Sequence, residues 1–293
     1  MKKILFDLKS KSLGDTICVM PCVDYLNEKS DNEIYIKIKP FFQTLFKESY
    51  PNVKYYSEGI TYDKTVDLNY DFTKPMQTGF AEQMGLFEWK YIRPKIDLPK
   101  DSSPMKRKYI SSGIHSTFQM KYWNDPIGGK YKTISPYWSK LFKMIKKDGY
   151  LPVVIEKDEM FGVPPYRNGL PSNCVKKINT PLDETITYIY HSEFFIGLSS
   201  GLSWVAHALG KPVVMISNFT EDWHEFDINV KDYTRITNKS VCHGCWNKNA
   251  WSQDSSYSDW DFCPEHKDTP RQFECHYSIT PDHVYNKIKH LLK

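Results

Sequence analysis

The stretch FFIGLSSGLSWVAHALGKPVVMIS (residues 194–217) decides the fold class. FFIGLS (194–199) is a short apolar run typical of a buried strand, SGLSWVAHALG (200–210) has the apolar spacing of a helix, and KPVVMIS (211–217) is a second apolar run. A strand, a helix and a strand in this order form a βαβ unit whose two strands lie parallel. The stretch therefore predicts an α/β protein with a parallel sheet.

The same alternation extends from this stretch toward the N-terminus. KYISSG (108–113) and LPVVIE (151–156) are further apolar runs that predict strands. Between them, Ser135 suits a helix N-cap, Pro136 suits the first helical position, and Gly149 marks the helix end. Alternating strands and helices predict a mainly parallel sheet with helices on both faces.

The first hundred residues predict a smaller α/β unit. Strands are expected at 4–8, 33–40 and 53–58, because these segments are apolar or alternate in polarity. A helix is expected from about residue 16 to 28, and FFQTLF (41–46) predicts a short one. This unit repeats the α/β character of the second.

A linker joins the two units. YIRPKIDLPKDSSPMKRK (91–108) carries three prolines and clustered charges, which is typical of a linker. We place the boundary near residue 105, which gives an N-terminal domain over 1–105 and a C-terminal domain over 106–293. A cleft is expected between them.

Composition excludes several other classes of protein. The chain has 293 residues with 40% hydrophobic and 25% charged residues, enough for a real core. Its apolar stretches fall short of the roughly 18–20 residues of a membrane helix, and its start lacks the apolar region of a signal peptide. A net charge of +4 does not by itself predict a polyanionic partner. We therefore expect a cytoplasmic protein with no membrane partner.

Four of the seven cysteines have metal-ligand spacing, Cys242-x2-Cys245-x17-Cys263-x11-Cys275. Four thiolates suit zinc or a single iron, and leave no open position for substrate, so a metal here would be structural. The alternative is a set of reduced, buried cysteines. The remaining cysteines are expected to pack in the core: Cys18, Cys22 and Cys174.

Ser199-Ser200-Gly201-Leu202 stands where a predicted strand turns into a predicted helix. The N–H groups and the positive end of a helix make such a turn an anion site, and small residues let a diphosphate approach. An ordinary N-cap role for Ser200 explains the same pattern.

A second turn is expected on the same side of the sheet. Residues 113–117 follow a predicted strand, and Ser116 and Thr117 offer hydroxyls there. Lys121 offers a point charge for a phosphate, although the usual role of a single lysine is to be solvated on the surface.

Asp15 follows Gly14 at the start of the first predicted helix. Asp at that place is commonly an N-cap. The alternative is a general base, which takes the proton of an acceptor hydroxyl. The residues alone do not choose between these roles.

Taken together, four segments resemble the bacterial autotransporter heptosyltransferases, metal-containing relatives of the lipopolysaccharide heptosyltransferases. They are HSTFQMKYWN (115–124), the stretch 194–220, EF (225–226) and VCHGCWN…FCPEHKDTPRQFEC (241–275). The resemblance is specific because the Ser-Ser-Gly turn and the four cysteines occur in the same order in one chain.

The resemblance implies a GT-B fold, with two Rossmann-like domains facing a cleft. It also implies a nucleotide-sugar donor held mainly by the C-terminal domain, and an inverting displacement that needs no catalytic metal. In the first half it is limited to the opening strand and Leu13-Gly14-Asp15, where Asp15 matches the catalytic base.

The resemblance also implies the donor-binding residues. Ser116, Thr117 and Lys121 match a donor-phosphate turn, where Lys121 stabilises the departing nucleoside diphosphate. A second phosphate turn is matched by Ser199, Ser200, Gly201 and Leu202. The finger over 241–276 holds iron in the family, so one structural iron per chain is implied, with zinc possible; its ligands are Cys242, Cys245, Cys263 and Cys275.

The acceptor is less defined. The family glycosylates protein hydroxyls, and its members carry a further N-terminal domain for acceptor capture and ring assembly. Here the catalytic strand is expected at residue 4, so we expect that domain and a large ring to be absent. The alternatives are a phage-type DNA glycosyltransferase acting on a hydroxymethylated base, and an inactive GT-B module that binds a partner through its metal finger.

Overall fold

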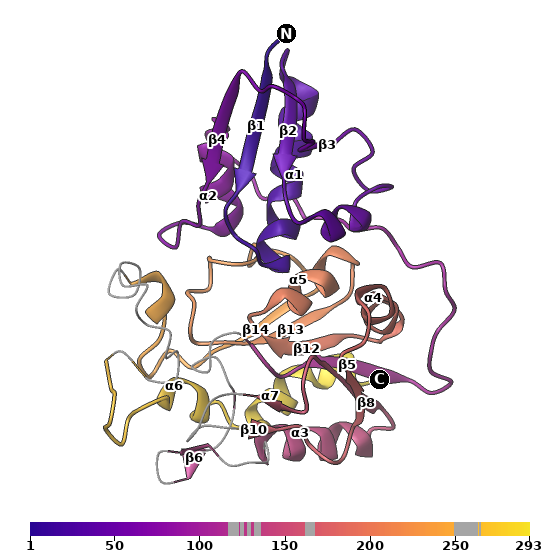
Figure 1. The fold of residues 1–293 in the computed structure, drawn as a ribbon. Helices are drawn as coiled ribbons and strands as arrows, with labels where there is room; N and C mark the ends of the chain where they lie inside the picture. Colours follow the sequence, from indigo (N-terminus) through magenta and orange to yellow (C-terminus); the bar gives the residue numbers. More distant parts are fainter. Residues whose placement is uncertain are drawn as a thin grey trace.

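A computed structural model describes residues 1–116, 123, 126–127, 130–131, 136–161, 168–248, 263 and 265–293. The chain forms two α/β units, each built on its own parallel sheet, and Figure 1 shows the smaller N-terminal sheet standing on the larger one. The helix N-cap expected at Ser135 lies outside the described residues.

The N-terminal sheet has four parallel strands in the order β3-β2-β1-β4. Its strands are β1 (Lys3–Leu8), β2 (Glu33–Lys37), β3 (Lys54–Tyr55) and β4 (Lys64–Leu68). Its helical elements are α1 (Leu13–Lys29), η1 (Pro40–Leu45) and α2 (Met76–Gln83). Figure 1 shows the carboxyl end of β1 directed toward the second unit, so the turn into α1 lies where the units meet.

The C-terminal sheet has six parallel strands in the order β11-β8-β5-β12-β13-β14. Its strands are β5 (Tyr109–Gly113), β8 (Leu151–Glu156), β11 (Val175–Ile178), β12 (Phe195–Leu198), β13 (Val213–Ile216) and β14 (Tyr233–Ile236). Its helical elements are α3 (Pro136–Lys147), α4 (Leu182–His191), α5 (Gly201–Ala208), η3 (Cys245–Asn247), α6 (Glu274–Tyr277), α7 (Pro281–Ile288) and η5 (Lys289–Leu291). Two separate antiparallel pairs of strands lie outside this sheet: β6 (Pro126–Ile127) with β7 (Lys130–Tyr131), and β9 (Met160–Phe161) with β10 (Asn168–Gly169).

Alternate residues of the central strands enter two different cores. In β13, Val213 and Met215 join the cluster that holds α4 and α5, whereas Val214 and Ile216 join the cluster that holds α3 and α7. Because successive side chains of a strand point to opposite faces, the helices must lie on both faces of this sheet. The prediction of a parallel sheet covered on both sides is confirmed.

The first of these cores continues into the N-terminal unit. The cluster that holds α4 and α5 also contains the buried face of α1, including Ile17 and Cys18. Cys18 and Cys22 are fully buried, so the packing role expected for them is confirmed.

Several elements differ from the sequence-based expectation. The strand expected at 53–58 shrinks to two residues, and β4 was missed because Lys64–Leu68 is an edge strand whose side chains are mostly exposed and lack an apolar run. The helix expected from residue 16 begins three residues earlier, because Ser12 caps it. No helix in the described ranges is long and apolar enough to cross a membrane.

Candidate functional site

Asp15 lies in the first turn of α1, at the junction of the two units. The N-cap of this helix is Ser12, whose Oγ accepts a hydrogen bond from the backbone N–H of Asp15 at 3.1 Å. The N-cap role considered for Asp15 is therefore wrong, and its half-buried carboxylate is not needed to start the helix. Burial raises the pKa of the nearby Tyr70, and the Asp15 carboxylate adds to that rise.

Two glycines bring α1 and α5 into close contact. A Cβ on Gly14 would lie 2.7 Å from Cδ1 of the buried Trp204, and a Cβ on Gly201 would lie 3.3 Å from Cβ of Leu13. Contacts of 2.7 Å are too short for real side chains, so Gly14 is required at this position. The close approach brings Leu13 and Gly14, the two residues before Asp15, against α5.

Gly14→Ala is expected to lower both the melting temperature and kcat. The added methyl overlaps the Trp204 ring, and such overpacking typically costs about 1–3 kcal/mol. Thermal unfolding and steady-state kinetics measure the two effects. Gly201→Ala is the matched control across the same interface, where the contact is looser; an equal loss of Tm in both variants would contradict the argument.

The turn Ser199–Leu202 joins β12 to α5 as expected. Ser200 occupies the N-cap position of α5, yet its side chain makes no capping hydrogen bond. Its buried Oγ has no hydrogen-bond partner among the described residues. The ordinary side-chain cap considered for Ser200 is therefore wrong, and this hydroxyl stands at the positive end of a helix.

A buried ion pair, Glu225 with Arg235, contacts this turn through Ser199. Ser199 Oγ donates a hydrogen bond to Glu225 Oε1, and Thr220 Oγ1 donates to the same carboxylate at 2.7 Å. Arg235 Nη1 lies 2.7 Å from Glu225 Oε2, with side chains only 6% and 3% exposed. Burial alone would lower the pKa of Arg235, but Glu225 and Tyr233 together outweigh burial and raise it. The guanidinium thus stays charged and neutralises the glutamate.

The turn after β5 lies beside the turn after β12, because the two strands are parallel neighbours. Ser116 Oγ donates to the carbonyl oxygen of Ser199 at 3.5 Å, which links the turns directly. The buried Glu156 accepts hydrogen bonds from the N–H groups of Ile114 and His115 at 2.5 and 2.7 Å. Thr117 and Lys121, predicted for this site, lie outside the described residues.

All four cysteines of the expected finger lie among the described residues. Cys245 and Cys263 are buried. Burial raises the pKa of the Cys275 thiol, and the neighbouring Cys245, Cys263 and Cys242 raise it further, so these sulfurs influence one another. Within the described residues, the group whose ligand atoms lie within 4.8 Å of one another is Cys242 with Glu265 and His266. The four-cysteine finger itself stays a prediction.

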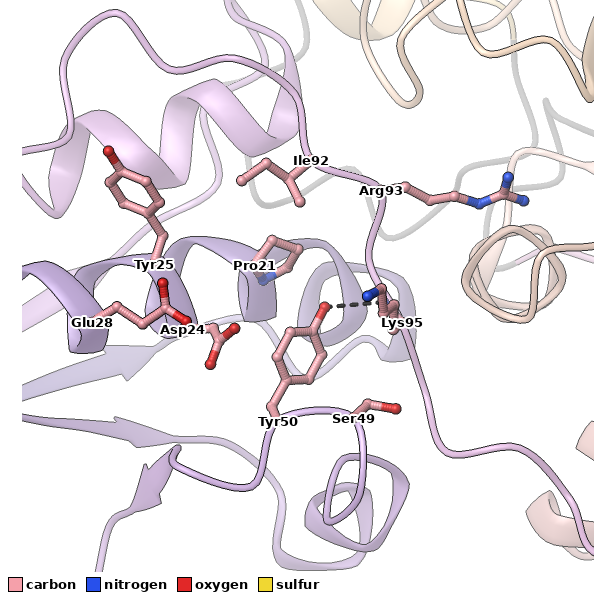
Figure 2. A pocket seen from close by; sticks show the side chains of 9 residues that line it. All are labelled: Pro21, Asp24, Tyr25, Glu28, Ser49, Tyr50, Ile92, Arg93 and Lys95. Atoms are coloured by element: carbon pink, nitrogen blue, oxygen red, sulfur yellow. Dashed lines mark hydrogen bonds between the residues drawn. The ribbon is translucent and has the colours of Figure 1, made fainter.

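A small pocket lies away from these residues, along the second half of α1. It has a volume of about 160 Å³, and Figure 2 shows Asp24, Glu28 and Tyr50 facing it with Lys95 of the linker. Tyr50 Oη accepts the Lys95 N–H at 3.0 Å. Asp24 is nine residues from Asp15, about 13 Å along a helix. The pocket therefore lies away from Asp15 and from the turns after β5 and β12.

Some residues of the site were missed from sequence. Glu156 is an acidic residue at the end of the otherwise apolar strand LPVVIE (151–156). This unusual position is visible in the sequence and could have indicated a functional role. Glu225 lies in the EF pair (225–226) that contributed to the family resemblance, but no role was predicted for it. Arg235 and Tyr70 gave no signal, because their contacts form only in the folded chain.

The fold matches solved glycosyltransferases. No family model matches the chain. A crystal structure of TibC, an iron-containing dodecameric glycosyltransferase from enterotoxigenic E. coli, superposes with a TM-score of 0.86 and 26% identity, covering 99% of this chain and 78% of that one. E. coli ADP-heptose lipopolysaccharide heptosyltransferase II shares the fold, with a TM-score of 0.64, 13% identity, and coverage of 99% of this chain and 98% of that one. Two facing α/β units of this kind define the GT-B class.

A curated relative identifies the family. The autotransporter heptosyltransferase Aah of Escherichia coli is 30% identical over 309 residues, which cover 99% of this chain and 74% of that protein. Two further relatives of the same kind match over 64% of this chain and over 42% and 43% of their own lengths. The chain belongs to the autotransporter heptosyltransferase family, and it is therefore a glycosyltransferase.

Proposed function

We propose that the protein transfers a heptose from a nucleoside-diphosphate donor to an acceptor hydroxyl, with inversion. The observation that carries the proposal is the close contact of α1 with α5, in which Leu13 and Gly14, the residues directly before Asp15, lie against Gly201 and Trp204 of the helix whose start suits a diphosphate. TibC has been solved in complex with ADP-D-β-D-heptose, which supports ADP-heptose as the donor here.

Asp15 is the proposed general base. It takes the proton of the acceptor hydroxyl while that oxygen forms the new bond to the anomeric carbon. The bond from this carbon to the diphosphate oxygen breaks, and its electron pair leaves with the nucleoside diphosphate. Attack from the face opposite the leaving group inverts the anomeric centre.

The two turns are proposed to bind the diphosphate. The N–H groups at the start of α5 and the Ser200 hydroxyl offer hydrogen bonds to one phosphate. Ser116 and Thr117 would bind the other, and Lys121 would stabilise the charge that develops on the leaving group. The Glu156 carboxylate accepts a hydrogen bond from the Ile114 N–H, and the Glu225 carboxylate pairs with Arg235. Because these contacts offset both negative charges, we expect little repulsion between either carboxylate and the donor phosphates.

We propose residues 1–105 as the acceptor side and 106–293 as the donor side. Membership of the family favours a serine or threonine hydroxyl of a protein as acceptor. The test incubates the purified protein with ADP-heptose, or with UDP- and GDP-sugars, and with either an autotransporter passenger protein or hydroxymethylated DNA. A mass shift on the protein with ADP-heptose is expected; no release of nucleoside diphosphate from any donor, or a shift on DNA alone, would overturn the proposal.

The cysteine segment is proposed to hold one structural iron, with zinc as the alternative. Thiols are soft donors that suit either metal, and buried thiols whose pKa is raised by burial need a cation to become thiolates. When bound, the metal would cross-link the segment through Cys242, Cys245, Cys263 and Cys275 and stabilise its fold.

Cys245→Ser is expected to lose most of the metal and to lower Tm by about 5 °C, because one of four ligands is weakened. Elemental analysis should find about one metal ion per wild-type chain. Cys174→Ser, outside the segment, is the control and keeps the metal. Full metal content and unchanged Tm in Cys245→Ser would count against the structural site.

The expectation that the protein forms no large ring stays a prediction. Measuring the molecular mass of the protein in solution tests it.

A further inference from the structure

Residues directly after Cys245 cross from the cysteine segment to the N-terminal unit. Trp246 Nε1 donates a hydrogen bond to Tyr70 Oη at 2.9 Å, and the two rings meet edge to face. Asn247 Nδ2 donates to the carbonyl oxygen of Phe72 at 2.5 Å. Two consecutive side chains of η3 thus hold one short segment that is 175 positions away in the sequence.

His224 extends the same contact. The backbone N–H of Met76 donates to the carbonyl oxygen of His224 at 2.8 Å, and His224 Nδ1 lies 3.1 Å from the carbonyl oxygen of Lys74. His224 Nδ1 also lies 2.8 Å from Asn247 Nδ2, and His224 Nε2 contacts Tyr70 Oη. The side chains of Trp246, Tyr70, His224 and Asn247 thus form one connected set of polar contacts.

The segment 70–76 has a regular contact pattern. Residues 70, 72, 74 and 76 each bond to the C-terminal unit, Tyr70 through its side chain and the other three through backbone groups. Most of this segment lies outside any helix or strand, between β4 and α2. Its placement therefore depends on these contacts more than on its own sheet.

On the C-terminal side of the contact, Trp246 and Asn247 follow the turn between Cys242 and Cys245, which we call the cysteine turn. Gly244, with φ +69°, allows the tight turn between Cys242 and Cys245, and its N–H donates to the carbonyl oxygen of Asn218 at 2.7 Å. The N–H of Trp246 donates to the carbonyl oxygen of Phe219 at 2.9 Å. The side chains of Trp246 and Asn247 are thus held by the same turn that carries two of the proposed ligands.

We propose that Trp246 and Asn247 form a clasp that fastens segment 70–76 to the cysteine turn, so that an intact turn keeps Tyr70 in place where the two units meet. The link to metal occupancy rests on the proposed metal site; the clasp contacts themselves do not. The clasp gives the cysteine segment a role in the geometry between the two units.

Hydrogen–deuterium exchange of peptides covering 70–76 tests the clasp in the full chain. Trp246→Phe keeps an aromatic ring against Phe219 and Tyr70 but removes the indole donor, and Asn247→Ala removes the amide. Each is expected to speed exchange of the 70–76 amides by about tenfold, the size expected for loss of a local contact, with metal content unchanged. Removing the metal from the wild type with a chelator is expected to do the same.

Tyr277→Phe is the matched control, because it removes one hydroxyl that bonds to Pro270 within the cysteine segment and does not touch residues 70–76. Its exchange should equal that of the wild type. Unchanged exchange at 70–76 in both Trp246→Phe and Asn247→Ala would overturn the clasp. If the protein purifies without metal, the metal proposal fails, and the two variants still decide the clasp.

Discussion

Asp15→Asn is expected to lower kcat by about 10²–10⁴-fold, the range that general-base catalysis supplies. Asparagine has nearly the same shape and leaves the Asp15 N–H free to donate to Ser12, so the start of α1 is kept. It cannot take a proton from the acceptor. Release of nucleoside diphosphate measures the loss, and calorimetric titration with the donor should give an unchanged Kd.

Asp24→Asn is the matched control for this prediction. Asp24 lies on the same helix and lines the pocket of Figure 2, about 13 Å from Asp15 along the helix. Burial and the neighbouring Glu28 raise its pKa, so its environment is unusual although it lies away from the two phosphate turns. Full activity is expected in Asp24→Asn. Equal rates in Asp15→Asn and wild type would remove Asp15 from the mechanism.

The central strands and helices could be predicted because their side chains decide them locally. FFIGL, LPVVIE and PVVMI are buried on both faces, which requires continuous apolar runs. The edge strands β4 and β14 carry polar residues, because at least one of their faces is solvated. Their strand identity comes from pairing with β1 and β13, which a sequence does not display.

The residues of the candidate site also fall into two groups, those that a local sequence pattern indicates and those that act through contacts across the fold. Asp15 and the Ser-Ser-Gly turn were found because they stand at a strand-to-helix junction, a local pattern. The contacts that fix them were not predicted: Trp204 and Glu225 lie in segments that carry the resemblance, but they act, with Arg235, through contacts across the fold. Excluding the N-cap role of Asp15 also needed the structure, since Ser12 is the cap; the general-base role of Asp15 stays a proposal.

Glu225 illustrates how a residue behind the site is expected to control it. Its carboxylate accepts from Ser199 and Thr220 and faces Arg235, all of them buried or nearly so. Glu225→Ala leaves the Arg235 guanidinium buried without its main partner. Breaking a buried pair in this way costs about 3–5 kcal/mol, so a large fall in the free energy of unfolding is expected from urea denaturation.

Replacing both partners separates stability from function. Glu225→Leu with Arg235→Met removes both buried charges, and such a swap is often neutral for stability. We expect the double variant to regain most of the stability lost in Glu225→Ala. It does not restore the acceptor for the Ser199 hydroxyl, so the phosphate turn stays loosened and KM for the donor stays raised by about tenfold, the equivalent of one hydrogen bond. A double variant with wild-type KM would show that the pair serves stability alone.

Asp232→Ala, which breaks the half-exposed Arg93–Asp232 pair, is the control and should lower the free energy of unfolding by no more than about 1 kcal/mol. The contrast follows from burial, because solvent screens one pair and is excluded from the other.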